Sequence, residues 1–425
     1  MMEINAERLK ANLLELAKIG YNEQDRGMYR IGFTDADMQG RQWLQDKAKS
    51  AGLETYMDGA GNVFFGRGAR DKPVVLMGSH IDTVPAGGIF DGALGVMAAL
   101  EVIQTIQQQQ PNIDTPIWGV ATAEEEGRFG GMLGSQAMSG CLNPDWLLSA
   151  HDADGVYLKD AMAAQGLDAM QALDAAWRPE QLKAFLELHI EQGPVLFQQD
   201  LQIGVVDGIS GVFKWIVHLK GKADHAGTAP MDMRSDAFMG LADFAHEIDR
   251  IIAENGTDKT RITVGKVELK PGHPHTVPGE AVFTIVGRDM DEGVMKELAN
   301  ACRKTLSAIA RKHRLMFEYE QVSWLEPKHC SGELTNLIEA QVKHRGYSYT
   351  RMPSGAGHDT QFMTEVTDAG LIFIPSVNGV SHAPDEWSHW HDVEAGANVL
   401  LDTIVAICGV DRDQKTAGNM LKKPK

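Results

Sequence analysis

Four apolar segments of the chain lead into histidines or carboxylates, and this pattern constrains the fold more than any other feature of the sequence. The segments cover residues 74–78, 117–122, 185–190 and 372–375. Apolar runs of this length, rich in β-branched residues, are typical of strands buried within a sheet. Because binding sites of α/β proteins lie at the ends of strands, the polar groups are expected to meet at one sheet edge. Strand and helix signals alternate as far as Leu201, which predicts an α/β fold with a mainly parallel sheet.

The first segment ends in a histidine and an aspartate. Side chains alternate along a strand, so His80 and Asp82 point the same way. This spacing suits a metal-bound imidazole whose orientation is set by a carboxylate nearby. Asp91 follows a flexible loop and precedes an apolar helix, where it would occupy the N-cap position. Capping alone is the alternative role of Asp91, because caps of this kind are common.

The second segment is followed at once by three glutamates, Glu124, Glu125 and Glu126. Carboxylates at the end of a buried strand repel one another unless a cation neutralises them, whereas on a solvated helix the same triplet would mean little. The third segment alternates and carries His189 on its polar side, so a sheet with one polar face is the alternative there. His382 comes just beyond the fourth segment.

Five of these residues form the kind of ligand set that two zinc-like ions need. They are His80, Asp91, Glu126, His189 and His382. One carboxylate can bridge both ions, and each ion then has a histidine and a further ligand, with positions left for water and substrate. Glu125 has no place in this set, which fits a general base.

Six motifs of the chain resemble the co-catalytic zinc amidohydrolases related to aminoacylase and carboxypeptidase G. From about Gly78 to Glu386 they read GSHIDTVPAGGIFDGALGV, ATAEEEGRFGG, HIEQGPVL, KADHAGTAPMDMRSDA, SGAGHD and IPSVNGVSHAPDE. Within them, HIEQGP, the GRF after the glutamates and SGAGHD are similar to the carbamoylase branch. That branch comprises N-carbamoyl-L-amino acid hydrolase, β-ureidopropionase and allantoate amidohydrolase.

The resemblance implies a metal-dependent hydrolase of linear amides. The expected substrate is an N-carbamoyl-L-amino acid, which would yield the amino acid, ammonia and carbon dioxide. Two divalent metal ions are expected in each subunit; zinc is the expected metal, although manganese, cobalt and nickel suit the same donors. In this resemblance Glu125 is the general base, Asp82 belongs to the catalytic set, and His225 helps to hold the oxyanion. A surface histidine in a glycine-rich turn is the alternative for His225.

The expected substrate is a small ureido or amide compound that bears a carboxylate. The resemblance implies that Gln192, Lys214, His275 and Arg288 contact it. The chain departs from the branch at two of these positions, because relatives generally have arginine near Lys214 and asparagine at His275. Lysine is a point charge and histidine is bulkier than asparagine, so a relative's substrate is not assumed for this chain. For Arg288 the alternative is a surface salt bridge.

Three other functions stay open. Hydrolysis of allantoate or another ureido acid is the nearest, since the motifs of these branches nearly coincide. An N-acyl amino acid hydrolase or dipeptidase is the second. A non-catalytic metal-binding protein is the third, and it is disfavoured because Glu125 persists beside the ligands.

A chain of 425 residues exceeds the usual size of one hydrophobic core, so two domains are expected. Residues 1–209 and 328–425 are predicted to form a discontinuous catalytic domain, because the insertion separates His189 from His382. The order of strands and helices in residues 210–327 predicts an inserted α+β domain with an antiparallel sheet and two helices. In the resembled family such a domain is the lid and the dimerisation module, so a homodimer is expected.

The formal charge of −18 argues against nucleic acid and anionic membranes as partners. Four cysteines show no CxxC pairing and read as reduced thiols. The first residues do not resemble a signal peptide, and no apolar run is long enough to cross a bilayer. We therefore expect a cytoplasmic protein.

Overall fold

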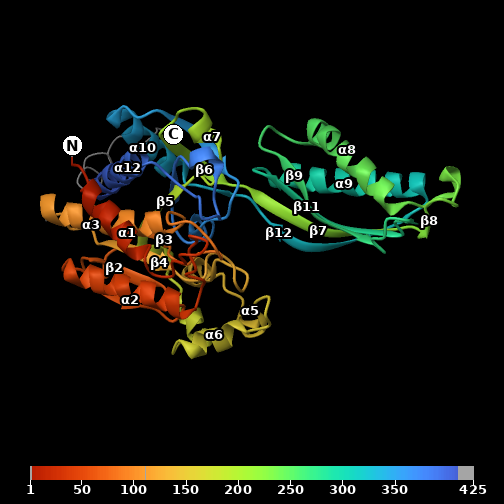
Figure 1. Cartoon of the computed structure of the whole chain (residues 1–425). Helices are drawn as coiled ribbons and strands as arrows, with labels where there is room; N and C mark the ends of the chain where they lie inside the picture. Colours follow the sequence, from red (N-terminus) through yellow and green to blue (C-terminus); the bar gives the residue numbers. More distant parts are fainter. Residues whose placement is uncertain (1, 111, 410–425) are drawn as a thin grey trace, which may run out of the picture. The chain divides into compact units, whose positions relative to one another are not determined.

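The structure is a computed structural model and describes residues 2–110 and 112–409 (Figure 1). The chain divides into two compact units. Unit 1 comprises Met1–Asp207 and His329–Lys425, and unit 2 comprises Gly208–Lys328. The catalytic role of the first unit and the lid and dimerisation roles of the second remain predictions.

Unit 1 is built around a nine-stranded sheet with the order β1-β2-β4-β3-β5-β15-β6-β13, in which β14 also pairs with β6. The strands are β1 Glu54–Met57, β2 Val63–Arg67, β3 Val74–His80, β4 Ile117–Thr122, β5 Leu182–Ile190, β6 Ile203–Ile209, β13 Lys328–His329, β14 Tyr349–Ser354 and β15 Ala369–Ile374.

The sheet is mixed rather than mainly parallel. Strands β4, β3, β5 and β15 run parallel to one another, whereas β1 with β2, β2 with β4, and β15 with β6 are antiparallel. For β1 and β2 the connection length explains the antiparallel pairing, because a short turn can join only antiparallel strands. Asp58 builds such a turn between β1 and β2 by accepting hydrogen bonds from the backbone N–H groups of Ala60 and Asn62. The α/β prediction is therefore confirmed in its coarser form.

The helices of unit 1 are α1 Ala6–Leu16, α2 Asp35–Ser50, α3 Ala93–Gln109, α4 Leu133–Ser139, α5 Pro144–Ser149, α6 Leu158–Ala164, α7 Val195–Gln198, α10 Gly332–Arg345, α11 Asp359–Met363 and α12 Trp390–Gly409. Helix α3 is buried along nearly its whole length in the main core, together with residues of α1, α2, α10 and α12. It returns the chain from β3 to β4, and Gly95 lets it approach the sheet, because a Cβ there would lie 2.5 Å from the Leu188 carbonyl oxygen. This close packing places the start of α3 beside the end of β3.

Unit 2 contains a four-stranded antiparallel sheet with the order β12-β7-β11-β9, and helices α8 and α9 share one of its faces (Figure 1). The elements are β7 Gly211–Lys220, α8 Ala237–Asn255, β9 Arg261–Lys270, β11 Glu280–Asp289, α9 Glu292–His313 and β12 Met316–Leu325. A two-stranded ribbon joins β8 Asp224–His225 to β10 Thr276–Val277. Alternation in β7 sends Phe213, Trp215, Val217 and Leu219 towards the helices.

Helix α8 begins at Ala237. Asp236 is its N-cap, and the carboxylate of Asp236 accepts hydrogen bonds from the backbone N–H groups of Phe238 and Met239. The preceding residues, Met231–Met233, form a 3₁₀ turn. Across residues 2–110 and 112–409, each helix is too short or too polar to cross a membrane.

Candidate metal centre

The carboxylate of Asp91 lies at the centre of a cluster of three histidines. Its Oδ1 atom is 3.1 Å from His189 Nε2 and 3.6 Å from His80 Nε2. Its Oδ2 atom is 3.2 Å from His382 Nε2, which in turn is 3.3 Å from Glu126 Oε2. The structure thus brings together all five residues that the sequence nominates as ligands, although they come from segments 300 positions apart in the chain.

Two groups of donor atoms in this cluster are compact enough to hold a metal ion, and they share Asp91. One consists of His80, Asp91 and His189, and the other of Asp91, Glu126 and His382. Because different oxygens of Asp91 face the two groups, this carboxylate can serve both sites at once. Imidazole and carboxylate donors in these numbers suit divalent transition metals such as zinc.

A third compact group contains Glu187, His189 and His358. The oxygens of Glu187 are already bonded, since one accepts from Ser79 Oγ at 2.7 Å and the other from the backbone N–H and the hydroxyl of Thr360. Glu187 therefore supports the neighbouring chain segments and is a poor candidate for a ligand.

Backbone carbonyls orient two of the histidines. His80 Nδ1 is 3.0 Å from the carbonyl oxygen of Asp82, and His189 Nδ1 is 2.9 Å from that of Ile190. When a metal ion is bound, Nδ1 of each ring would carry the proton and Nε2, which faces Asp91, would be free to bind the ion. The sequence pattern suggests instead that the Asp82 carboxylate orients His80, but the nearer carboxylate oxygen is 3.8 Å from Nδ1. The carboxylate of Asp82 accepts a hydrogen bond from the backbone N–H of Glu126.

Asp91 is not the cap of α3, so capping does not account for it. The N-cap position belongs to Gly92, and no side chain caps this helix. Gly92 has a φ of 62°, and a Cβ atom there would lie 2.4 Å from the ring of His80. The turn before α3 therefore needs glycine, and it aims Asp91 at the histidines.

Gln192 lies against the cluster, where its Nε2 donates to Asp91 Oδ2 at 2.7 Å and is 3.3 Å from His382 Nε2. Gln192 and His382 both have positive φ values, 57° and 54°. Left-handed backbone at residues other than glycine is uncommon and concentrates at functional sites. A substrate contact by Gln192 remains a prediction.

Glu386 is a supporting residue that the sequence reasoning missed. It is 3% exposed, and its Oε1 accepts hydrogen bonds from the backbone N–H groups of Phe90 and Asp91. Its Oε2 accepts from Ser381 Oγ at 2.9 Å. Glu386 thus ties the loop that carries Asp91 to the loop that carries His382. Its place at the end of the VSHAPDE motif is the signal that could have identified it.

The three glutamates after β4 have three different surroundings. Glu124 turns away from the histidines and accepts hydrogen bonds from the backbone N–H groups of Phe129 and Gly131, and burial raises its pKa to about 8. Glu125 Oε2 is 3.4 Å from His80 Nε2, yet Glu125 belongs to neither of the two groups around Asp91. Glu126 faces His382.

Burial and mutual repulsion shape the charges of this cluster. Burial raises the pKa of Glu125 well above its usual range. Burial also raises the pKa of Glu126 to about 7, and the negative charge of Asp91 adds to this increase. Although burial opposes it, hydrogen bonds from the three histidines hold the pKa of Asp91 well below the usual range. Several buried carboxylates at one place are most readily accommodated by bound cations, so the residues present fit a pair of divalent ions.

A pocket of about 340 Å³ adjoins the cluster. Asp82 and Glu126 line it on the side of the cluster, and Val84, Pro85 and Arg128 line it elsewhere. The guanidinium of Arg128 is held by the carboxylate of Asp152 and by the Gly32 carbonyl oxygen. This pocket leaves room for a small molecule beside Glu126.

The remaining predicted site residues, Lys214, His225, His275 and Arg288, lie in unit 2. The β7–β11 register pairs Lys214 with Val286 and Arg288 with Val212, so the two cations lie on the same sheet face, away from α8 and α9. Within the described residues Arg288 makes no hydrogen bond or ion pair. The surface salt bridge that was the alternative role of Arg288 is therefore not observed there.

His225 lies on the β8–β10 ribbon, and His275 immediately precedes β10. Residue 225 pairs with Thr276, and the backbone N–H of Ala226 donates to the carbonyl oxygen of His275 at 2.9 Å.

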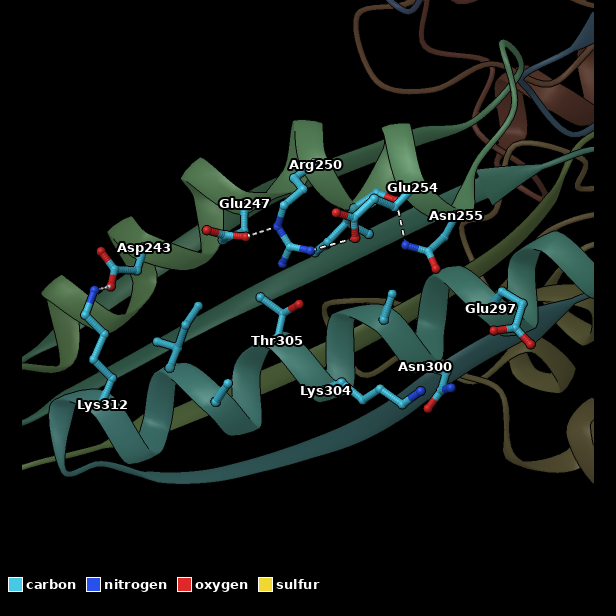
Figure 2. A pocket seen from close by; sticks show the side chains of 14 residues that line it. Asp243, Glu247, Arg250, Glu254, Asn255, Glu297, Asn300, Lys304, Thr305 and Lys312 are labelled. Carbon is cyan, nitrogen blue, oxygen red and sulfur yellow. Dashed lines mark hydrogen bonds and ion pairs between the residues drawn. The ribbon is translucent and has the colours of Figure 1, made fainter.

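A separate groove of about 500 Å³ runs between α8 and α9 and contains the ion pairs of Asp243 with Lys312 and of Arg250 with Glu247 and Glu254 (Figure 2). None of the predicted site residues lines this groove.

Comparison with known proteins shows the family of this chain. The family model described as Peptidase family M20/M25/M40 matches residues 76–406. An N-carbamoyl-L-amino acid amidohydrolase of Geobacillus stearothermophilus is 37% identical over 94% of this chain and 98% of its own length. An allantoate amidohydrolase of Escherichia coli is 35% identical over 88% and 91% of the two chains. The crystal structure of an amidase of the hydantoinase/carbamoylase family from Burkholderia multivorans superposes with a TM-score of 0.89, at 32% identity over 96% and 98% of the two chains.

Proposed function

The chain belongs to peptidase family M20/M25/M40, and from this premise we propose that it hydrolyses the ureido group of an N-carbamoyl-L-amino acid. The balanced reaction converts R–NH–CO–NH₂ and water into R–NH₂, carbon dioxide and ammonia. Relatives that match nearly the whole chain carry the name of this activity, including one from Paenarthrobacter aurescens at 34% identity. The resemblance to the carbamoylase branch is thereby confirmed at the level of the family.

One observation carries the proposal: a carboxylate stands beside the two candidate metal groups without belonging to either. Glu125 is 3.4 Å from His80 and outside both groups around Asp91. A hydrolase needs such a group to receive a proton from water and return it to the leaving nitrogen. A protein that only stores or senses metal has no use for it.

We propose that His80, Asp91, Glu126, His189 and His382 hold two divalent ions in each subunit, with zinc as the expected metal. When bound, such ions polarise the scissile carbonyl and acidify water. Glu125 then accepts the proton of the attacking water and delivers it to the departing nitrogen. His225 supports the oxyanion of the tetrahedral intermediate, from its own subunit or from the partner of a homodimer.

Unit 2 supplies candidate groups for the acid end of the substrate. Arg288 is half-buried, its burial lowers its pKa, and it is unpaired within the described residues. Lys214 lies on the same sheet face. A guanidinium suits bidentate binding of a carboxylate, so we assign the main contact to Arg288 and a weaker one to Lys214. Gln192 and His275 complete the proposed substrate contacts.

Allantoate is the second candidate substrate, because relatives from Escherichia coli and Bacillus subtilis are named allantoate amidohydrolases. N-acyl amino acids and dipeptides rank behind both. We propose that the protein is cytoplasmic, because its four cysteines are free thiols, three of them buried, and thiols stay reduced in the cytoplasm.

A substrate panel tests these proposals. Metal-reconstituted protein is incubated with N-carbamoyl amino acids, allantoate, N-acyl amino acids and dipeptides, and ammonia, carbon dioxide and free amino acid are measured. We expect ammonia and carbon dioxide from N-carbamoyl amino acids, and none from the Glu125→Gln variant. Release of a carboxylic acid from N-acyl substrates alone would contradict the proposal, and so would an absence of turnover with every amide.

A further inference from the structure

Arg41 of helix α2 is completely buried and joins three backbone carbonyls. Its Nη1 donates to the carbonyl oxygens of Gly61 at 3.0 Å and Ala121 at 3.3 Å. Its Nη2 donates to the carbonyl oxygen of Thr122 at 3.1 Å. Helix α2 lies outside the segment matched by the family model, so neither the motifs nor that match draw attention to this residue.

Two carboxylates surround the same guanidinium. Asp37, one turn earlier in α2, has Oδ1 at 3.0 Å from Arg41 Nε, and both side chains are fully buried. The other oxygen of Asp37 accepts a hydrogen bond from the backbone N–H of Phe33. On the far side, Asp82 Oδ1 is 3.9 Å from Arg41 Nη2. The three carbonyl oxygens therefore hold the guanidinium in one orientation, in which its charge faces the carboxylate of Asp82 among the metal-site residues.

These contacts connect the ends of two strands. Ala121 and Thr122 are the last residues of β4, from which the chain continues to Glu125 and Glu126. Asp82 follows β3, its carbonyl oxygen contacts His80 Nδ1, and its carboxylate accepts the backbone N–H of Glu126. A displacement of Arg41 would thus shift the residues at the ends of both strands.

We propose that Arg41 is a positioning residue that holds the ends of β3 and β4 in the arrangement needed for metal binding and proton transfer. The inference rests on the proposed function for its kinetic part and on the candidate metal groups for its binding part. A planar guanidinium has several donors, so it can contact three backbone carbonyls and face two carboxylates at the same time. A lysine ammonium cannot do this. Without Arg41, Asp37 would lose its ion-pair partner and Asp82 a nearby cation, and the buried guanidinium of Arg30 would be the one left to act on both carboxylates.

The test compares Arg41→Met and Arg41→Lys with Arg345→Met. Arg345 is the matched control, because it forms a nearly buried ion pair with Asp402 in the same unit, at 2.6 Å, and contacts no residue of the candidate metal centre. The full-length chains are measured well below their melting temperatures. The readouts are zinc affinity by competition with a chelator, melting temperature, and kcat and KM separately.

We expect Arg41→Met to lower zinc affinity and kcat by roughly 10- to 100-fold, with little change of KM, and Arg41→Lys to lie between it and the native chain. Arg345→Met should lower the melting temperature without changing zinc affinity or kcat. The proposal is overturned if a folded Arg41 variant binds zinc as tightly as the native chain, or if Arg345→Met loses the same affinity. If Arg41→Met does not fold, Arg41→Lys decides by the same comparison. Because zinc affinity needs no substrate, this outcome is separate from a failure of the proposed carbamoyl activity.

Discussion

His382 Nε2 lies 3.2 Å from Asp91 Oδ2, although 290 residues separate the two in the chain. Asp91 comes from the loop before α3, and His382 comes from the loop after β15. Glu386 and Ser381 link the two loops through hydrogen bonds. The contact therefore depends on the packing of distant parts of unit 1, and it completes the second of the two groups that share Asp91.

Glu125→Gln should remove activity and leave the metal in place. Glutamine keeps the shape of the side chain but cannot accept a proton, and loss of a general base costs roughly 100- to 10,000-fold in kcat. His80→Ala and Asp91→Ala should lose metal as well as activity. Metal content by mass spectrometry, measured beside kcat, separates the two classes of variant. A Glu125→Gln protein without metal would place this residue among the ligands.

Subunit mixing should show whether His225 acts across a dimer. We expect a homodimer in which His225 completes the site of the neighbouring subunit. Glu125→Gln and His225→Ala proteins, each inactive alone, should regain part of the activity after exchange, because a hybrid dimer contains one intact site. Exchange is verified with differently tagged chains. If exchange is complete and activity stays absent, each chain uses its own His225.

Arg288→Leu should lower kcat/KM for a carboxylate substrate by roughly 30- to 1000-fold, since a charge-assisted bidentate contact is worth about 2–4 kcal/mol. Lys214→Ala should have a smaller effect, because its side chain is exposed and flexible. His275→Asn should shift preference towards the substrates of relatives that carry asparagine. The control is the substrate amide, whose acid end is neutral: equal losses for acid and amide would show that Arg288 does not recognise the carboxylate.

Glu386→Ala should weaken metal binding by roughly 10- to 100-fold, because residues that orient metal ligands contribute on this scale. The change leaves the backbone N–H groups of Phe90 and Asp91 without their acceptor and frees Ser381. Chelator competition measures the effect directly. Glu339→Ala is a suitable control, since Glu339 pairs with Lys343 and Arg351 at a surface helix of the same unit. Equal metal affinities in the two variants would argue against this role of Glu386.

Thiol reagents at neutral pH should modify Cys141 much faster than Cys302 or Cys330. Cys141 is exposed, whereas burial raises the pKa of the Cys302 and Cys330 thiols to about 12. These two residues therefore hold almost no reactive thiolate at neutral pH. Mass mapping after brief labelling of the native protein checks the order, with Cys141→Ser as the control. Activity should survive the labelling, because Cys141 contacts no residue of the candidate metal centre. Rapid labelling of Cys302 would mean that the core of unit 2 opens readily.

The sequence pattern was sufficient for the parts of the site that local rules govern. Buried strands are apolar and end in small or polar residues, so the pattern located His80, Glu126 and His382 at or beyond strand ends. The glutamate triplet predicted a bound cation on charge grounds alone. Motif resemblance then led to the family, which the comparison confirmed.

Other features depended on contacts that no local pattern encodes. Asp91 looks like a helix cap from its neighbours, and only the fold shows that Gly92 takes that position while Asp91 faces the histidines. The hydrophobic pattern of a strand does not fix its direction, so only the fold shows that β2 with β4 and β15 with β6 are antiparallel.

By itself, the sequence determined the chemistry available at the site, since residue types decide which donors and acids the chain can offer. The tertiary structure alone decided which of them meet and what holds them. Arg41, Gln192 and Glu386 gain their places from side-chain hydrogen bonds between residues as much as 296 positions apart. Such bonds form only after the core has packed, because their geometry is set by distances between elements and not by the order of residues along the chain.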